Sequence, residues 1–375
     1  MTCKLQPKEG VKLPRLLRIV ALVLRVAVGV VFVFSGVVKA ADPYGTVLKI
    51  GEYLHALGIE WLGPLSGAMC VALVSVEVAL GVALVVGAWP RVVLPVVVAF
   101  NLFYTALTLW LATANPIGDC GCFGDVVVLT NWQTFWKNVA LLGGSAVAWA
   151  VLGREKGAKW GGVCAIVALV ATVAFALYNL LCLPLVEKFP FGEGVDLRAL
   201  VMGEQEAQQS EVGRVVCRNV ATGEVESFDV NDPTWWDESV WEFLEMEDSE
   251  AAEDRVAVTG RDFVLTDEQG DMTADIVEFE GTTVLLCVQL TERVSPREWK
   301  LIVKTITEAQ HRGERVVVVT ATEIAEATEA LARAGVDVMG VEVSNLDITT
   351  LQVVVRAPIG VVWLRDGVIE KKIRL

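Results

Sequence analysis

The stretch Gly118-Asp119-Cys120-Gly121-Cys122-Phe123-Gly124-Asp125 is the part of the chain from which the rest can be interpreted. It stands between two long apolar segments, so we expect a loop at one face of a membrane. A disulfide between two cysteines separated by one glycine closes a small, strained ring, and glycine is the residue that bends most readily. Strain makes such a bridge easier to reduce, so the pattern favours thiol–disulfide exchange at Cys120 and Cys122.

Three other interpretations of this loop stay open. The two cysteines could form a permanent structural bridge, bind a metal ion, or lie in a glycine-rich turn without a chemical role. A metal site is the weakest alternative, because two neighbouring thiols do not fill a tetrahedral site and the chain has only 2 histidines. We therefore expect no metal.

The composition differs between the two halves of the chain. Of the 375 residues, 54% are hydrophobic, and the excess lies in the first half. The net charge of −15 is concentrated in the second half, where acidic residues crowd between Glu193 and Asp254. This asymmetry indicates a membrane part followed by an acidic soluble part, and it argues against binding to nucleic acid.

Five apolar runs are long enough to cross a hydrocarbon core of about 30 Å, which takes about 20 helical residues. The first run is too long for a cleaved signal peptide, and a charge at Arg25 interrupts it. We predict membrane-spanning helices at residues 15–39, 64–89, 91–113, 132–152 and 160–182.

Basic residues set the expected orientation of these spans. They precede the first span and lie between the second and third and between the fourth and fifth, whereas the cysteine loop has none. The positive-inside rule then puts the N-terminus in the cytoplasm, and the loop and residues 183–375 outside. We expect a multi-pass protein of the inner (cytoplasmic) membrane, in contact with lipid, with its loop where disulfides persist.

Three polar residues, Arg25, Glu77 and Asn101, fall inside the predicted spans. At 1.5 Å per residue, Arg25 and Glu77 come out about 20 Å below the outer ends of their helices, and Asn101 about 18 Å. Charges at that depth usually pair within a bundle, so we predict an ion pair between Arg25 and Glu77. The functional alternative is a site for protons or a quinone head group.

The second half of the chain predicts a hairpin and then an α/β domain. The hairpin pairs residues 214–220 with 224–230. After residue 255, apolar strands alternate with helices and end in a hairpin, which is typical of a mixed sheet. We predict strands at 283–289, 316–320, 336–341, 353–356, 360–364 and 368–373, and helices at 296–311 and 323–334.

Residues 15–152 resemble a known group of membrane proteins. The run Arg25-(x3)-Gly29-(x2)-Phe32-(x2)-Ser35-Gly36-(x2)-Lys39, with Glu77, Gly81 and Gly87, resembles the DoxX group. The run from Asp119 to Gly124, followed by Asn131-Trp132-(x3)-Trp136-Lys137-Asn138, is similar to the methylamine-utilisation MauE relatives of that group. The resemblance implies a four-helix membrane bundle. It also implies a role in disulfide formation in exported partners, or in quinone-linked electron transfer.

Residues 256–375 resemble the thioredoxin fold. The run Arg356-Ala357-Pro358-Ile359-Gly360 and the hairpin after it are similar to the cis-proline strand of that fold, which implies that Pro358 is the cis-proline. The active dithiol of the fold belongs after strand 283–289, where the sequence Thr291-Glu292-Arg293-Val294-Ser295-Pro296 has no cysteine. We therefore expect a domain that binds or positions a partner, with Cys287 as a core residue.

The complete prediction has four parts. A four-helix membrane domain (1–153) is followed by a fifth transmembrane helix (154–182), an acidic linker with a hairpin (183–255) and a thioredoxin-like domain (256–375). The function we expect is that of a membrane thiol–disulfide oxidoreductase, or an accessory of one. It would act on exported thiol-containing proteins through Cys120 and Cys122 and pass electrons to a membrane quinone.

Two alternatives to this function remain open. The first is a quinone-associated respiratory subunit in which Arg25 and Glu77 matter and the cysteines do not. The second is a membrane anchor or assembly factor that presents the C-terminal domain to partners. Among the other cysteines, Cys70 is a candidate relay near the loop, and Cys182 and Cys217 could pair.

Overall fold

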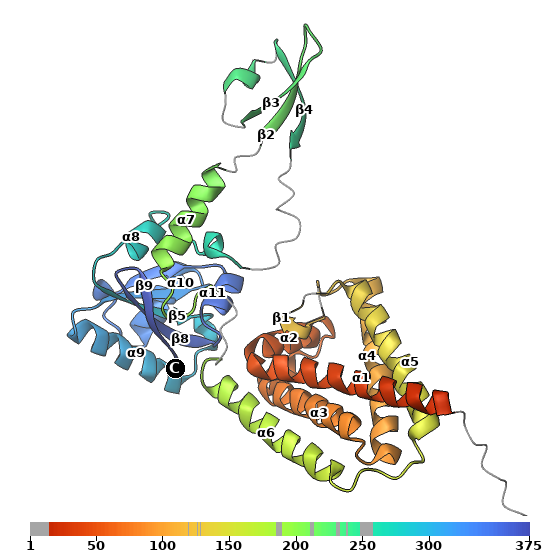
Figure 1. Ribbon diagram of the computed structural model, residues 1–375. Coiled ribbons are helices and arrows are strands. Elements are labelled where there is room, and N and C mark those ends of the chain that lie inside the picture. The colour runs from red at the N-terminus through yellow and green to blue at the C-terminus, as the bar shows by residue number, and fades with distance from the viewer. Residues whose placement is uncertain are drawn as a thin grey trace, which may run out of the picture. The chain divides into compact units, whose positions relative to one another are not determined.

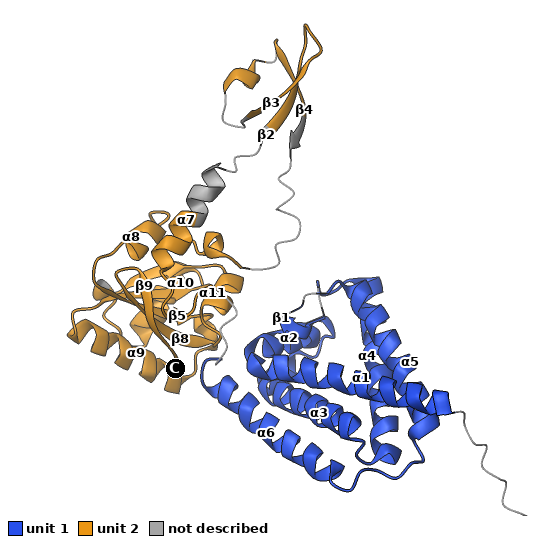
Figure 2. Ribbon diagram, viewed as in Figure 1, with its two compact units in different colours: residues 1–186 blue, residues 187–375 orange. Residues whose placement is uncertain are grey.

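The computed structural model in Figure 1 describes residues 15–118, 120–125, 127, 129–184, 190–210, 214–229, 233–237, 239–247 and 258–375. The chain forms two compact units, residues 1–186 and residues 187–375, which Figure 2 distinguishes by colour. Each unit is described by itself.

Long apolar helices make up most of the first unit. They are α1 (Arg15–Ala41), α3 (Ser66–Val86), α4 (Pro90–Ala114), α5 (Asn131–Leu152) and α6 (Gly161–Leu181). The short helix η1 (Glu60–Leu65) runs directly into α3 and extends it. By length and composition, all five helices can cross a membrane, which confirms the predicted spans.

One further helix in this unit, α2 (Pro43–Ala56), was not predicted. It follows α1 after a break at Asp42 and packs against α3. Its polar residues interrupt any apolar run, so the hydrophobic pattern gives no sign of it. The one local signal is Pro43 in the first turn, where a missing N–H costs nothing.

Small residues bring α1 and α3 close together. A Cβ atom at Gly81 would lie 2.7 Å from the backbone nitrogen of Val33, and one at Gly29 would lie 2.9 Å from the Gly81 carbonyl oxygen. Gly36 lies equally close to Val78 farther along the contact. Membrane helices use such small residues because packing replaces the hydrophobic effect as the force that joins them.

The second unit is built on a five-stranded mixed sheet in the order β7-β6-β5-β8-β9. Strands β5, β6 and β7 are parallel, whereas β8 and β9 are antiparallel to their neighbours. The strands are β5 (Thr282–Val288), β6 (Arg315–Thr320), β7 (Glu342–Asn345), β8 (Ile359–Arg365) and β9 (Val368–Arg374). The helices that follow β5, β6 and β7 are α9 (Pro296–His311), α10 (Ile324–Arg333) and α11 (Ile348–Val354).

The best-predicted elements of this unit are β5 and α9. Strand β5 is a continuous apolar run and is buried along almost its whole length, as expected for a central strand. Helix α9 begins after Ser295, whose hydroxyl accepts from the Glu298 N–H while the Glu298 side chain accepts from the Ser295 N–H. Its apolar face, with Ile302 and Ile306, packs on the sheet.

Two of the predicted strands are wrong. Residues 353–356 were expected to be extended, but the chain there ends helix α11. The Asp347 carboxylate accepts from the N–H groups of Thr349 and Thr350, at 2.8 and 3.1 Å, and this cap starts a helix in a β-branched run. The strand expected at 336–341 is β7 instead, which begins at Glu342.

The predicted cis-proline is also corrected. No cis peptide bond occurs among the described residues, so the bond before Pro358 is trans. The segment before β8 is held by Gln289, which directly follows β5. The Gln289 backbone N–H donates to the Pro358 carbonyl at 3.0 Å, and its side chain donates to the Ala357 carbonyl at 2.8 Å.

A small antiparallel sheet in the order β3-β2-β4 precedes this domain in the chain. Strands β2 (Arg214–Asn219) and β3 (Val225–Asp229) form the predicted hairpin. The third strand, β4 (Trp241–Glu247), falls in a segment that we expected to be loop. Its acidic residues alternate with apolar ones, and the surrounding acidic run hid that alternation. Helix α7 (Leu197–Ser210) and the short α8 (Thr273–Val277) complete the unit.

Candidate functional site

The cysteine loop connects α4 to α5 and contains the short strand β1 (Cys122–Asp125). A disulfide joins Cys120 and Cys122, whose Cα atoms are 5.5 Å apart. Gly121 has a φ of +63°, and a Cβ atom there would lie 2.8 Å from Cγ of Lys49. Only glycine satisfies both the left-handed backbone and the close approach of the lysine.

Side chains from three helices hold the loop. The Tyr53 hydroxyl of α2 donates to the Cys120 carbonyl at 3.2 Å, and the Ser35 hydroxyl of α1 donates to the Cys122 carbonyl at 2.8 Å. At the start of α5, the Asn131 amide donates to Asn115 Oδ1 and to the Ile117 carbonyl, both at 2.9 Å. The disulfide is therefore fixed on the end of the helical bundle.

A buried ion pair lies directly beneath the loop. The Lys39 ammonium is 2.7 Å from both carboxylate oxygens of Glu77, and each residue is about 95% buried. The Ser35 hydroxyl, which binds the loop, also lies 3.2 Å from Glu77 Oε2. Because a hydroxyl has one hydrogen, Ser35 serves one acceptor at a time and links the loop to the ion pair.

The predicted pair between Arg25 and Glu77 is wrong. Glu77 is level with Ser35, whereas the Arg25 guanidinium lies near Gly87, at the other end of α3. Our depth estimate assumed that the first two spans end at the same height. Instead, Ala40 at the end of α1 packs in one cluster with Cys70 and Val74 of α3, and this register brings Glu77 beside Lys39. Arg25 Nε has no hydrogen-bond partner among the described residues.

A small cavity of about 40 Å³ opens between the ion pair and the loop. This volume suffices for two or three water molecules, since about 15 Å³ of such space holds one. Cys122 lines the cavity together with seven polar residues from four helices: Ser35, Lys39, Glu77, Asn101, Tyr104, Lys137 and Asn138. Two of the three intramembrane polar residues singled out in the sequence, Glu77 and Asn101, thus share one cavity, and Arg25 does not.

The amides in this cavity are bonded to neighbouring helices. Asn101 donates to Ser145 Oγ at 3.3 Å, and Asn138 donates to Thr108 Oγ1 at 3.2 Å. Both bonds join α4 to α5, so they hold together the two helices that the cysteine loop connects. The two amides are thus used for helix packing, and the charged side chains are the groups of the cavity that can gain or lose a proton.

The two lysines of the cavity stand in the runs that resemble known families, but the sequence analysis did not single them out as site residues. The Lys137 ammonium lies 4.2 Å from the centre of the Phe123 ring, a cation–π contact with the residue after Cys122. Lys39 and Lys137 each interrupt an apolar span close to its loop end, which is the same signal that drew attention to Arg25 and Glu77.

The remaining cysteines are free thiols in the part of the chain that the structure describes. Cys182 is exposed in the first unit and Cys217 is buried in the second, and the pairing considered for them stays a prediction. Cys70 is buried, and its thiol donates to the Pro43 carbonyl at 3.5 Å. Burial raises the pKa of the Cys287 thiol to about 12, in agreement with its expected place in the core.

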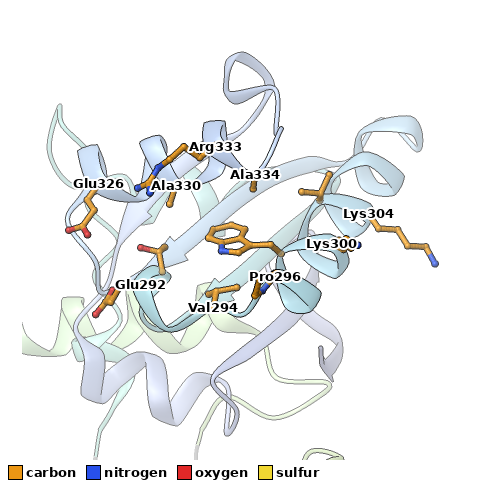
Figure 3. A pocket seen from close by; sticks show the side chains of 12 residues that line it. Glu292, Val294, Pro296, Lys300, Lys304, Glu326, Ala330, Arg333 and Ala334 are labelled. Atoms are coloured by element: carbon orange, nitrogen blue, oxygen red, sulfur yellow. The ribbon is translucent and has the colours of Figure 1, made fainter.

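The C-terminal domain has a groove of its own, with a volume of about 830 Å³. In Figure 3, Pro296, Lys300 and Lys304 of α9 lie on one side, and Ala330 and Arg333 of α10 lie on the other. Trp299 also lines it. Thr291 also lines the groove, and it begins the stretch in which the thioredoxin resemblance would place a dithiol.

Residues 17–152 match the family model of methylamine utilisation protein MauE. The match covers α1 to α5, with the cysteine loop and the whole cavity. It confirms the resemblance to MauE for this part of the chain. No curated protein and no solved structure matches the chain. The resemblance of residues 256–375 to the thioredoxin fold therefore stays a prediction.

Proposed function

We propose that the protein is a membrane thiol–disulfide oxidoreductase, or a component of one, and that Cys120 and Cys122 are its redox group. The observation that carries this proposal is the position of the disulfide. It is fixed by Tyr53 and Ser35 on the end of an apolar helical bundle, directly above a buried ion pair. A bridge that served only as a staple would need neither the cavity nor the charges beneath it.

The reaction is an exchange of two electrons between dithiols. A thiolate of an exported partner attacks one sulfur of the Cys120–Cys122 bridge and forms a mixed disulfide, while the other sulfur leaves as a thiolate. The second thiol of the partner then releases the oxidised partner and leaves the loop as two thiols. A membrane quinone of the lipid phase takes the two electrons and two protons from these thiols, becomes a quinol, and restores the bridge.

This chemistry requires the loop to face the oxidising side of the inner membrane. The loop carries no basic residue, whereas the connection between α5 and α6 carries three: Arg154, Lys156 and Lys159. Trp132 and Trp136 at the start of α5 are exposed, as expected for an aromatic belt at the membrane interface. Both features support an outward loop with the C-terminal domain on the same side.

Alkylation of intact cells tests the proposal. Cysteine-bearing peptides of the full chain are labelled with and without mild reductant and resolved by mass spectrometry. We expect the pair to be found in both oxidised and reduced forms, and the Cys120→Ser, Cys122→Ser double variant to lose oxidation of partner thiols. Cys164→Ser, at an exposed position of α6, is the matched control and should retain it.

Two results would contradict the redox role. One is a pair that is always reduced in aerated cells, and the other is a bridge that strong reductant does not open. Either result would leave the loop as a turn or a structural bridge.

The groove of the C-terminal domain supports a second candidate function, in which the membrane part is an anchor and the domain holds a partner. Trp299 gives this groove a large aromatic surface of the kind that dominates binding sites. The two functions separate in one comparison. If the double cysteine variant keeps the oxidation of partner thiols in cells and Trp299→Ala abolishes it, the membrane part serves as an anchor.

A further inference from the structure

Cys120 and Cys122 have different surroundings. Cys120 is buried beside Leu111 and Ile117, in an apolar cluster at the end of α4. Cys122 is partly buried and touches the same cluster, but it also lines the cavity beneath the loop, where charged side chains lie. A negative charge on sulfur is costly in the first environment and can be stabilised in the second.

The cavity offers more positive than negative charge. Its ionisable lining consists of the Lys39 and Lys137 ammonium groups, the Glu77 carboxylate and the Tyr104 phenol. Two ammonium groups and one carboxylate leave one net positive charge. The Glu77 carboxylate is bound to Lys39, whereas no described carboxylate lies within ion-pair distance of Lys137. Among the described groups of the cavity, Lys137 is therefore the charge without a counterion.

The other ionisable groups around the loop are already engaged. On α2, Lys49 pairs with Glu52 at 2.9 Å, and Tyr53 donates to the Cys120 carbonyl. Asp119 and the side chain of Asp125 lie outside the described residues. Among the described groups around the loop, those of the cavity therefore have the excess positive charge that could stabilise an anion.

We propose that this cavity is a sulfur-anion site, in which Lys137, supported by Lys39, holds the thiolate of Cys122. The inference rests on the proposed function for its role in catalysis, because it assigns the two cysteines their parts in the exchange. The partner thiolate attacks Sγ of Cys120 and forms the new S–S bond there. The Cys120–Cys122 bond breaks, and its electron pair leaves with Cys122 into the cavity.

The pKa values of the two thiols in the reduced protein test this site without reference to activity. The full chain is reduced in lipid nanodiscs, alkylated across a series of pH values, and resolved by peptide mass spectrometry. A cysteine beside a lysine has a pKa of about 7 or below, against about 8.5 for a free thiol. We expect Cys122 to titrate at least about one pKa unit below Cys120, which means about tenfold more thiolate below both pKa values.

Three variants locate the cause of this difference. Lys137→Met keeps the apolar stem but removes the charge and should raise the pKa of Cys122 by about one unit. Lys137→Arg keeps the charge and should keep the pKa low, which separates electrostatics from packing. Lys159→Met, in the exposed connection between α5 and α6, should leave the pKa unchanged.

The outcomes for the site and for the proposed function are distinguishable. The sulfur-anion site is wrong if Cys122 titrates no lower than Cys120, or if Lys137→Met and Lys159→Met give the same value. A low pKa of Cys122 with a pair that does not cycle in cells would keep the site and reject the oxidoreductase. If both hold, the Cys122→Ser variant incubated with a disulfide-bonded partner should accumulate mixed disulfides on Cys120. Cys120 then bonds to one partner sulfur, the other partner sulfur leaves as a thiolate, and no Cys122 is present to reverse the step. Cys120→Ser should accumulate fewer mixed disulfides on Cys122.

Discussion

Lys39 and Glu77 form an ion pair that is almost fully removed from solvent, inside helices that are long enough to lie in lipid. Glu77→Gln would leave the Lys39 ammonium buried without a counterion, at a cost of about 3–5 kcal/mol in the free energy of unfolding. The double variant Lys39→Met, Glu77→Gln should lose less than the two single variants together. Unfolding of the purified protein in detergent measures this coupling.

Arg25 is the matched control for this cycle. Its guanidinium lies near Gly87 and does not contact Glu77, so Arg25→Met and Glu77→Gln should have additive effects, within about 0.5 kcal/mol. A strong coupling between Arg25 and Glu77, with none between Lys39 and Glu77, would mean that the pairing described here is wrong.

The Cys287 thiol gives the C-terminal domain a pH dependence. Burial raises its pKa from 9.0 to about 12, so the folded domain holds the proton at pH values where the unfolded chain has lost it. Its contribution to stability is therefore fully present below pH 9 and is lost as the pH rises toward 12. Stability measured by denaturant unfolding should fall over this range, and less steeply in Cys287→Ala. Equal slopes in the two proteins would contradict this assignment.

At the residue scale, the sequence predicts local pairs better than distant ones. Cys120 and Cys122 are two residues apart, so their spacing alone brings their sulfur atoms together. The partner of Glu77 depends on how far α3 is displaced along α1, and no residue in either helix encodes that displacement locally. Lys39 was visible as a charge in an apolar run, but the pair could be identified only after the two helices were in register.

At the scale of elements, the contact of α1 with α3 depends on glycines. A Cβ atom at Gly81 would lie 2.7 Å from Val33 N and 2.8 Å from Gly29 O, both backbone atoms that cannot move away singly. We expect Gly81→Ala to destabilise the bundle by about 1–3 kcal/mol, as overpacking does. The readout is the thermal unfolding midpoint in detergent.

Gly143 of α5 supplies the control for this substitution. A Cβ atom there would meet nothing within 4 Å, so Gly143→Ala should be neutral or slightly stabilising because alanine favours the helix. Similar losses in the Gly81 and Gly143 variants would show that helix propensity, not the close approach of α1 and α3, decides the result.

The sequence predicts a helix or strand correctly when the residues that determine it lie within that element. Helix α9 carries a capping box and an N-terminal proline, and its predicted bounds, 296–311, agree with the structure. The last two residues of helix α11 were assigned to a strand at 353–356 because they are β-branched, while the Asp347 cap starts a helix that includes them. Strand β4 was missed because its acidic residues were assigned to surface loop.

At the scale of the whole chain, the change from apolar to acidic sequence predicts a membrane part and then a soluble part. The structure divides into compact units at residue 186. Run length predicted all five spans, because crossing a hydrocarbon core requires a minimum number of apolar residues and leaves few alternatives. How the spans pack, and which polar residues meet between them, follows from side-chain fit and is not readable from hydropathy.

The orientation of these spans yields the last prediction. Helix α6 crosses the membrane between the connection that contains Lys156 and the exposed Cys182, so the two positions should lie on opposite sides. In intact cells, a membrane-impermeant thiol reagent should label Cys182, and should not label a cysteine introduced by Lys156→Cys until the membrane is opened. In the orientation that we propose, the positive charges of the α5–α6 connection keep it in the cytoplasm, and the acidic C-terminal half lies outside with the cysteine loop. Labelling of both positions in intact cells would mean that α6 is not a span. The C-terminal domain and the disulfide would then face different compartments and could not act on one exported partner.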